Sequence, residues 1–77
     1  MTKWEYCVLR QVVPPGKEDP RQAMWQTSEG GSANYKGEEA AFAVRFKALG
    51  DQGWELVSHQ FTQALVGEYL SVFKRPK

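Results

Sequence analysis

The stretch that decides the fold is Gly53-Trp54-Glu55-Leu56-Val57-Ser58, which echoes the opening of the chain, Lys3-Trp4-Glu5-Tyr6-Cys7-Val8. In both stretches a Trp-Glu pair leads into alternating side chains, the pattern of a β-strand with two distinct faces. A third run of this kind, residues 69–74, closes the sequence. The sequence therefore predicts three strands with one helix between the first two.

The helix is predicted over residues 38–49. Glu38 and Glu39 lie in its first turn, where the helix dipole favours negative charge, and Gly50 follows as a C-terminal stop. The apolar residues that share one helix face at i, i+4 and i+7 spacing are Phe42, Phe46 and Leu49. This stripe predicts that the helix packs on the sheet.

The simplest sheet places the last strand in the centre, antiparallel to both other strands, with the helix as a right-handed crossover between them. The predicted fold is thus a two-layer α+β domain over residues 1–77. It has an antiparallel-dominated sheet of three to four strands and one helix on one face. The residues expected to form much of its core are Phe42, Phe46, Leu49, Trp4, Tyr6, Val8, Trp54, Leu56 and Phe73.

Residues 14–37 form an insertion for which two interpretations stay open. In one, Asp19 caps a short helix. In the other, residues 23–29 form a strand that turns at Gly30-Gly31 and returns through residues 32–35. We favour the hairpin, because its aromatic and β-branched residues suit a pleated surface.

The charge balance excludes several classes of partner. The chain has 77 residues, ten of them basic and nine acidic, for a net charge of +1. Such balance provides no electrostatic footprint for nucleic acid or for an anionic membrane. No run approaches the ~18 apolar residues of a membrane span, and no secretory signal pattern opens the sequence. The expected compartment is the cytoplasm.

Few residues are suited to catalysis or metal binding. Cys7 is the single cysteine and His59 the single histidine, too few for an intramolecular disulfide or a structural zinc site. A lone cysteine in a strand usually serves as a small hydrophobic residue. Glu38 and Glu39 are explained by their place at a helix start. The sequence therefore predicts a protein that is not an enzyme, with no catalytic residue, metal or cofactor.

Aromatic residues near basic ones permit a second interpretation. Some single-strand nucleic-acid binders stack bases on aromatic rings of an open sheet. The residues relevant to this alternative are Trp4, Tyr6, Trp54, Tyr69 and Phe73. A domain this small needs such rings in its core, so we favour the core over a stacking surface.

Several motifs occur together in a specific order: Trp4-Glu5-Tyr6, Leu49-Gly50, Gly53-Trp54-Glu55-Leu56-Val57-Ser58 and Phe73-Lys74-Arg75-Pro76. With them, the chain resembles the small bacterial domain of unknown function 4177 family. The resemblance covers the first strand and everything from the helix onward. Residues 14–37 are longer than a minimal member needs, and Cys7 stands where a polar residue is more usual. The resemblance implies a fold but no activity, because no function is established for the family as a whole.

The expected function is protein interaction or self-association. The expected partner is a second copy of the chain, in a homodimer, or another protein. Nucleic-acid binding is the alternative. A sheet with one helix leaves its other face uncovered unless the insertion or a second copy packs there. The candidate interaction surface consists of Met24, Trp25, Tyr35, Leu9, Val57, Leu70 and Val72.

Overall fold

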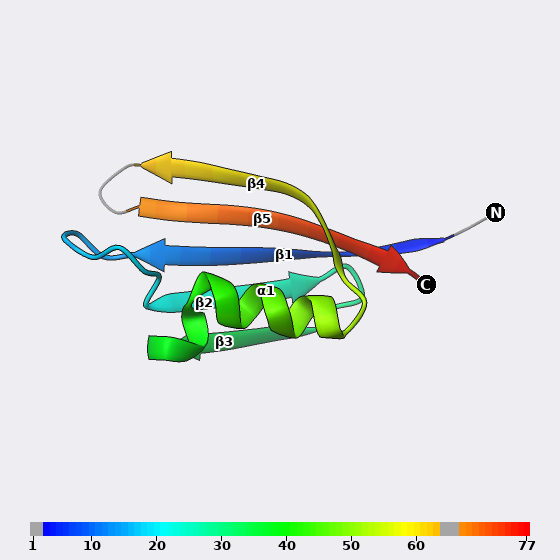
Figure 1. The fold of residues 1–77 in the computed structure, drawn as a ribbon. Helices are drawn as coiled ribbons and strands as arrows, with labels where there is room; N and C mark the ends of the chain where they lie inside the picture. The colour runs from blue at the N-terminus through cyan, green and yellow to red at the C-terminus, as the bar shows by residue number, and fades with distance from the viewer. Residues whose placement is uncertain (1–2, 64–66) are drawn as a thin grey trace.

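The computed structural model describes residues 3–63 and 67–77, and Figure 1 shows one sheet with a helix against it. The elements in chain order are β1 (Trp4–Val13), β2 (Gln22–Thr27), β3 (Ser32–Lys36), the 3₁₀ turn η1 (Gly37–Ala40), α1 (Phe42–Asp51), β4 (Glu55–Gln63) and β5 (Gly67–Pro76). The strand order is β3-β2-β1-β5-β4, and every neighbouring pair is antiparallel. The α+β class, the antiparallel sheet and the place of the last strand between the first strand and β4 are confirmed.

The expected number of strands is wrong, since the described part of the chain forms a sheet of five rather than three to four. The two extra strands come from the insertion, residues 14–37, which forms the favoured hairpin of β2 and β3 instead of a helix capped by Asp19. Gly30 adopts φ 95° at the turn, a conformation that glycine tolerates best. The Thr27 hydroxyl accepts a hydrogen bond from the Gly31 N–H at 2.8 Å and closes the loop.

The helix is shifted along the chain relative to the prediction. Ala41 is extended, with φ −63° and ψ 151°, and separates η1 from α1. Its neighbour Ala40 is fully buried, and the Gln11 side chain donates to the Ala40 carbonyl at 2.9 Å. At the other end α1 continues through Gly50, which is therefore not the stop. The chain turns at Gly53, where φ is 89°.

The two faces of β1 are the reverse of those predicted. Alternation along β1 places Cys7, Leu9 and Gln11 beneath α1, all buried, whereas Tyr6 and Val8 lie exposed on the opposite face. A helix of ten residues covers little of the sheet. The aromatic partners of Phe42 and Phe46 on the sheet come from β5 and β4, namely Tyr69, Phe73 and His59.

The core accordingly differs from the expected set. Its buried apolar residues are Cys7, Leu9, Ala23, Ala40, Leu49, Trp54 and Phe73, with Trp25, Tyr35 and Phe46 packed against it. The expected residues that are instead exposed are Trp4, Tyr6, Val8 and Leu56. Phe42 is half-buried and makes an edge contact with Phe46, with 6.1 Å between the ring centroids. Alternation reveals that a strand has two faces, but it does not say which of them a helix covers.

Candidate functional site

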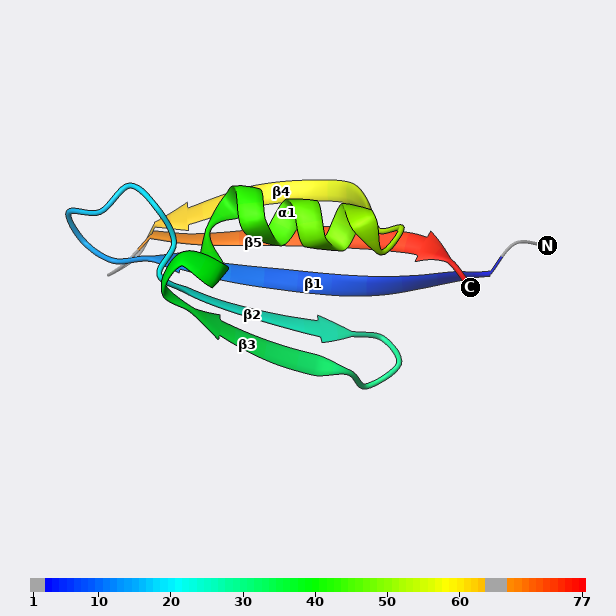
Figure 2. The same cartoon turned by 60° about the horizontal axis from the view of Figure 1, so that its bottom comes forward.

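The candidate site is the face of the sheet opposite α1, called here the open face. Figure 2 shows α1 on one side of the sheet and no described element across the other side. The insertion does not fold over it, because β2 and β3 extend the sheet sideways. Of the two coverings considered for this face, the insertion is therefore excluded by the described residues.

Apolar side chains gather on the central strands of the open face. Val8 of β1 is paired directly with Val72 of β5, and Arg10 with Leu70, so these side chains share one face. The apolar residues of this face are Trp4, Tyr6, Val8, Val12, Met24, Leu70 and Val72. All are exposed or half-buried in the single chain. They lie on β1, on β5 and, for Met24, on β2, and the charged Arg10 lies among them, in register with both Leu70 and Met24.

Polar side chains border this patch on both sides. The open-face residues of the two edge strands are Ser32, Asn34 and Lys36 on β3, and Glu55, Ser58, Gln60 and Thr62 on β4. An apolar centre surrounded by a polar rim is the usual anatomy of a protein interface. Apolar patches with such a rim mark interaction sites more often than single exposed apolar residues do.

Charges on the open face balance one another. The Arg10 Nε lies 2.8 Å from a Glu68 carboxylate oxygen. Lys74 is paired in register with Glu55, and its Nζ lies 4.4 Å from the centroid of the Trp4 ring. The face therefore presents no strong field of either sign.

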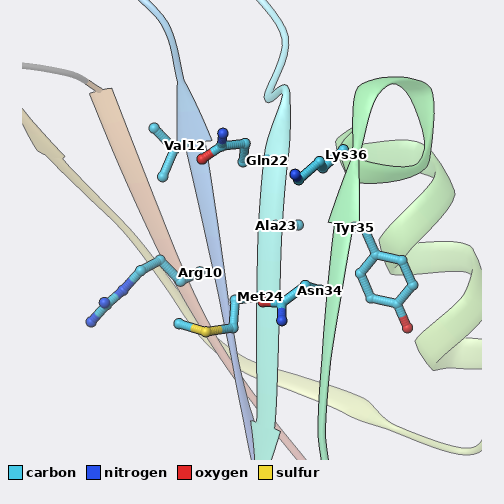
Figure 3. Close-up of a pocket in the computed structure, with 8 residues that line it drawn as sticks. All are labelled: Arg10, Val12, Gln22, Ala23, Met24, Asn34, Tyr35 and Lys36. Carbon is cyan, nitrogen blue, oxygen red and sulfur yellow. The ribbon is translucent and has the colours of Figure 1, made fainter.

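A pocket opens at one end of the open face. It has a volume of about 470 Å³, and its lining residues are Arg10, Val12, Gln22, Ala23, Met24, Asn34, Tyr35 and Lys36. Figure 3 shows that the side chains of Arg10, Val12 and Met24 point to the open side, whereas Tyr35 points toward the helix. The pocket lies at the C-terminal end of β1, and Trp4 and Tyr6 lie at its N-terminal end.

The repeated Trp-Glu motif has a structural explanation at the end of β5. On the open face Lys74 lies over the first tryptophan, Trp4. On the helix face the guanidinium carbon of Arg75 lies 4.2 Å from the ring centroid of the second, Trp54, and Arg75 forms an ion pair with Glu5. Adjacent basic residues of one strand thus serve both motifs, one on each side of the sheet.

Cys7 and His59 do not form a reactive pair. Cys7 lies on β1 and His59 on β4, with β5 between the two strands. The His59 Nδ1 is hydrogen-bonded to the hydroxyl of the buried Ser71 at 2.7 Å, and the ring stacks on Tyr69 with centroids 5.3 Å apart. Across residues 3–63 and 67–77, no group of three or more His, Cys, Asp or Glu residues is placed to hold a metal ion.

The Cys7 thiol is expected to be inert in the folded protein. Burial raises the pKa of Cys7 to about 11 from the ordinary 9.0, so at pH 8 its thiolate fraction falls by about a hundredfold. We expect Ellman's reagent to modify the native protein at least a hundredfold more slowly than the protein in denaturant. Equal rates in the two states would contradict this burial.

The same pKa shift predicts a loss of stability at alkaline pH. Between pH 9 and pH 11 the unfolded thiol loses its proton while the folded thiol keeps it. The unfolded state then binds fewer protons, so stability decreases as pH rises through this range. A Cys7→Ala variant should lack this part of the decrease in a pH series of denaturant unfolding curves.

The structure brings together only some of the residues predicted for the interaction surface. Met24, Leu70 and Val72 share the open face, whereas Val57 is exposed at an irregularity of β4. The assignment of Leu9 is wrong, because it is fully buried beneath α1.

The two aromatic residues predicted for this surface lie on the helix face instead. Trp25 makes an edge contact with Trp54, with ring centroids 6.2 Å apart. The guanidinium carbon of Arg45 lies 3.6 Å from the centroid of the Tyr35 ring. Both residues are half-buried there and support the helix rather than the open face.

Sequence reasoning missed four residues of the open face, and all come from β1: Trp4, Tyr6, Val8 and Val12. One signal in the sequence points to their exposure. The strand face that they share also contains Arg10. The residues of the opposite face from Cys7 to Gln11 carry no charge. A charged side chain is rarely buried beneath a helix without a partner.

Comparison with known protein families, with curated proteins and with solved structures finds no match for this chain. In the part of the chain that the structure describes, no helix is long and apolar enough to cross a bilayer.

Proposed function

We propose that this protein is a non-enzymatic self-association module of the cytoplasm. In this proposal two copies form a homodimer by packing their open faces together. The observation that carries the proposal is the apolar patch of the central strands, bordered by polar residues of both edge strands and left uncovered in the single chain. Face-to-face packing of two sheets is a common way to bury such a surface.

The size of the open face suits a stable dimer. The five strands contain 40 residues in all. At about 3.3 Å per residue and about 4.8 Å between strands, the face measures roughly 630 Å². Two copies packed face to face would bury roughly 1,300 Å², at the lower end of the range of about 1,200–2,000 Å² for specific protein interfaces.

Nucleic-acid binding is the second candidate, and the exposure of two rings favours it. Trp4 and Tyr6 lie on a central strand with their side chains 40% and 46% exposed, where bases stack in single-strand binders. The charges weigh against it, because Arg10 is paired with Glu68 and Lys74 lies opposite Glu55. Single-strand binders combine stacking rings with a positive groove.

Sedimentation equilibrium of charged variants tests the dimer. We expect the parent to reach twice its chain mass of 8.8 kDa as concentration rises from micromolar to millimolar. Val8→Lys introduces a charge at the centre of the open face and should weaken dimerisation about a hundredfold. Val44→Lys is the matched control, because Val44 is 40% exposed on α1 and Val8 is 38% exposed.

The outcomes separate the two candidates. A single monomer mass for the parent over the whole concentration range would exclude the homodimer. Equal weakening by Val8→Lys and Val44→Lys would place the interface elsewhere. Retention on a single-stranded nucleic-acid column that falls steeply with salt would favour the second candidate instead.

We also propose that the chain belongs to the domain of unknown function 4177 family that it resembles. The contacts of Lys74 and Arg75 support this, because they give the Trp-Glu motifs and the closing Lys-Arg pair one joint structural role. The insertion, residues 14–37, departs from a minimal member by adding two strands at one edge of the sheet.

A further inference from the structure

We propose that the homodimer has a two-fold axis that crosses β1 at Val8. The axis lies in the plane between the two packed sheets and runs perpendicular to the strands. This axis places Trp4 and Tyr6 of each copy in the pocket of the other. The inference rests on the proposed function, and it specifies which residues anchor the interface and how the copies are oriented.

The position of the axis follows from the strand register. Val8 and Val72 are directly paired and lie near the middle of β1 and β5, the two longest strands. A perpendicular axis at position 8 exchanges positions that lie equally far on either side of it. Position 4 therefore lies over position 12 of the second copy, and position 6 over position 10.

The chemistry of the pocket fits the rings that this axis brings to it. Val12 and Met24 supply an apolar surface and a polarisable sulfur, both favourable for aromatic rings. The guanidinium of Arg10 lies where it can stack on the partner's tyrosine ring at position 6. A volume of about 470 Å³ falls within the range of about 300–1,000 Å³ typical of binding pockets.

Symmetry strengthens the inference. In a two-fold interface each residue that inserts into a pocket does so twice, so anchor and pocket must both lie on the same surface of one chain. Here they lie at opposite ends of β1, with Val8 midway between them. Tryptophan, tyrosine and arginine are the residues that most often dominate interface affinity.

Spin-label distances test the orientation of the axis. In a Cys7→Ala background, single labels are placed through Ser58→Cys and Thr62→Cys, both on the rim of β4 and in register with Val72 and Glu68. The perpendicular axis predicts copies of position 58 about 10 Å apart across the interface and copies of position 62 about 28 Å apart. An axis parallel to β1 would make the two distances equal, at roughly 22 Å.

A double-mutant cycle tests the seating of the rings. We expect Tyr6→Ala to raise the dimer dissociation constant about thirtyfold and Tyr6→Phe to change it by less than threefold. Tyr6 and Met24 are four residues apart in register and lie on different strands, too far apart to interact within one chain. We expect the effects of Tyr6→Ala and Met24→Ala on the dimer dissociation constant to be non-additive by at least threefold. The reason is that the two side chains meet only across the interface.

The results distinguish the failure of this inference from the failure of the proposed function. A parent that stays monomeric overturns both. A dimer with equal label distances at positions 58 and 62, or with fully additive effects of Tyr6→Ala and Met24→Ala, overturns this inference alone. Short and long distances in the predicted order, together with non-additivity, support it.

Discussion

Replacing Leu9 with alanine is expected to lower the free energy of unfolding by about 3–5 kcal/mol. Leu9 is 0% exposed and lies in register between Trp25 of β2 and Ser71 of β5, beneath the helix. Removing its side chain leaves a cavity that the surrounding strands are too tightly paired to close. Denaturant unfolding followed by tryptophan fluorescence measures the loss.

Val8→Ala is the matched control for Leu9→Ala, since Val8 is the next residue in the same strand and faces the other side. Measured at a concentration where the protein is monomeric, Val8→Ala should cost less than about 1 kcal/mol. The two variants together test which face of β1 the helix covers. A larger loss for Val8→Ala than for Leu9→Ala would show that the helix covers the face with Trp4, Tyr6 and Val8, contrary to the structure.

Replacing Trp54 with alanine, as a separate single variant, is also expected to lower the free energy of unfolding by about 3–5 kcal/mol. The Trp54 side chain is 5% exposed, makes an edge contact with Trp25 and lies beneath the guanidinium of Arg75. Its loss removes packing between the helix C-terminus, the insertion and the last strand. Arg75 also donates to the Gln52 carbonyl at 2.8 Å, so the same contact anchors the turn after α1.

Trp4→Ala is the control for Trp54→Ala, because both tryptophans precede a glutamate in the same sequence motif. Trp4 is 40% exposed and contacts Lys74 on the open face, so its replacement should cost about 1 kcal/mol in the monomer. Thermal or denaturant unfolding at low protein concentration checks both variants. Equal losses would show that the two motifs are equivalent, contrary to the structure.

Much of the fold could be predicted from local patterns. The hairpin in residues 14–37 was predictable because Gly30-Gly31 separates two runs that suit strands, and glycine allows the turn. The place of β5 between β1 and β4 follows from chain connectivity, because the helix precedes β4 and β4 leads into a return strand that pairs on both sides. The hairpin depends on residues close together in sequence, whereas β5 pairs with the distant β1.

The candidate site was less predictable, since it depends on which face of each strand is covered. Met24, Leu70 and Val72, which the sequence predicts for an interaction surface, share the open face. Leu9 is predicted for that surface because it lies on the strand face opposite Trp4, Tyr6 and Val8, which are expected in the core. Gln11 proved to be buried, with its side-chain amide satisfied in part by the Ala40 carbonyl. Such a long-range hydrogen bond has no local sequence signal.

The sequence by itself determined the α+β class and the place of the last strand between the first strand and the Trp54 strand, and it favoured the hairpin over a capped helix, because alternation, turn glycines and connectivity are visible along the chain. Only the tertiary structure decided the side of the sheet that α1 covers. Both phases of β1 contain apolar residues, so either face could have become the core. The choice depends on the packing of Trp25, Trp54 and Phe73 around Leu9 beneath the helix, residues far apart in sequence. That packing leaves Trp4, Tyr6 and Val8 on the open face.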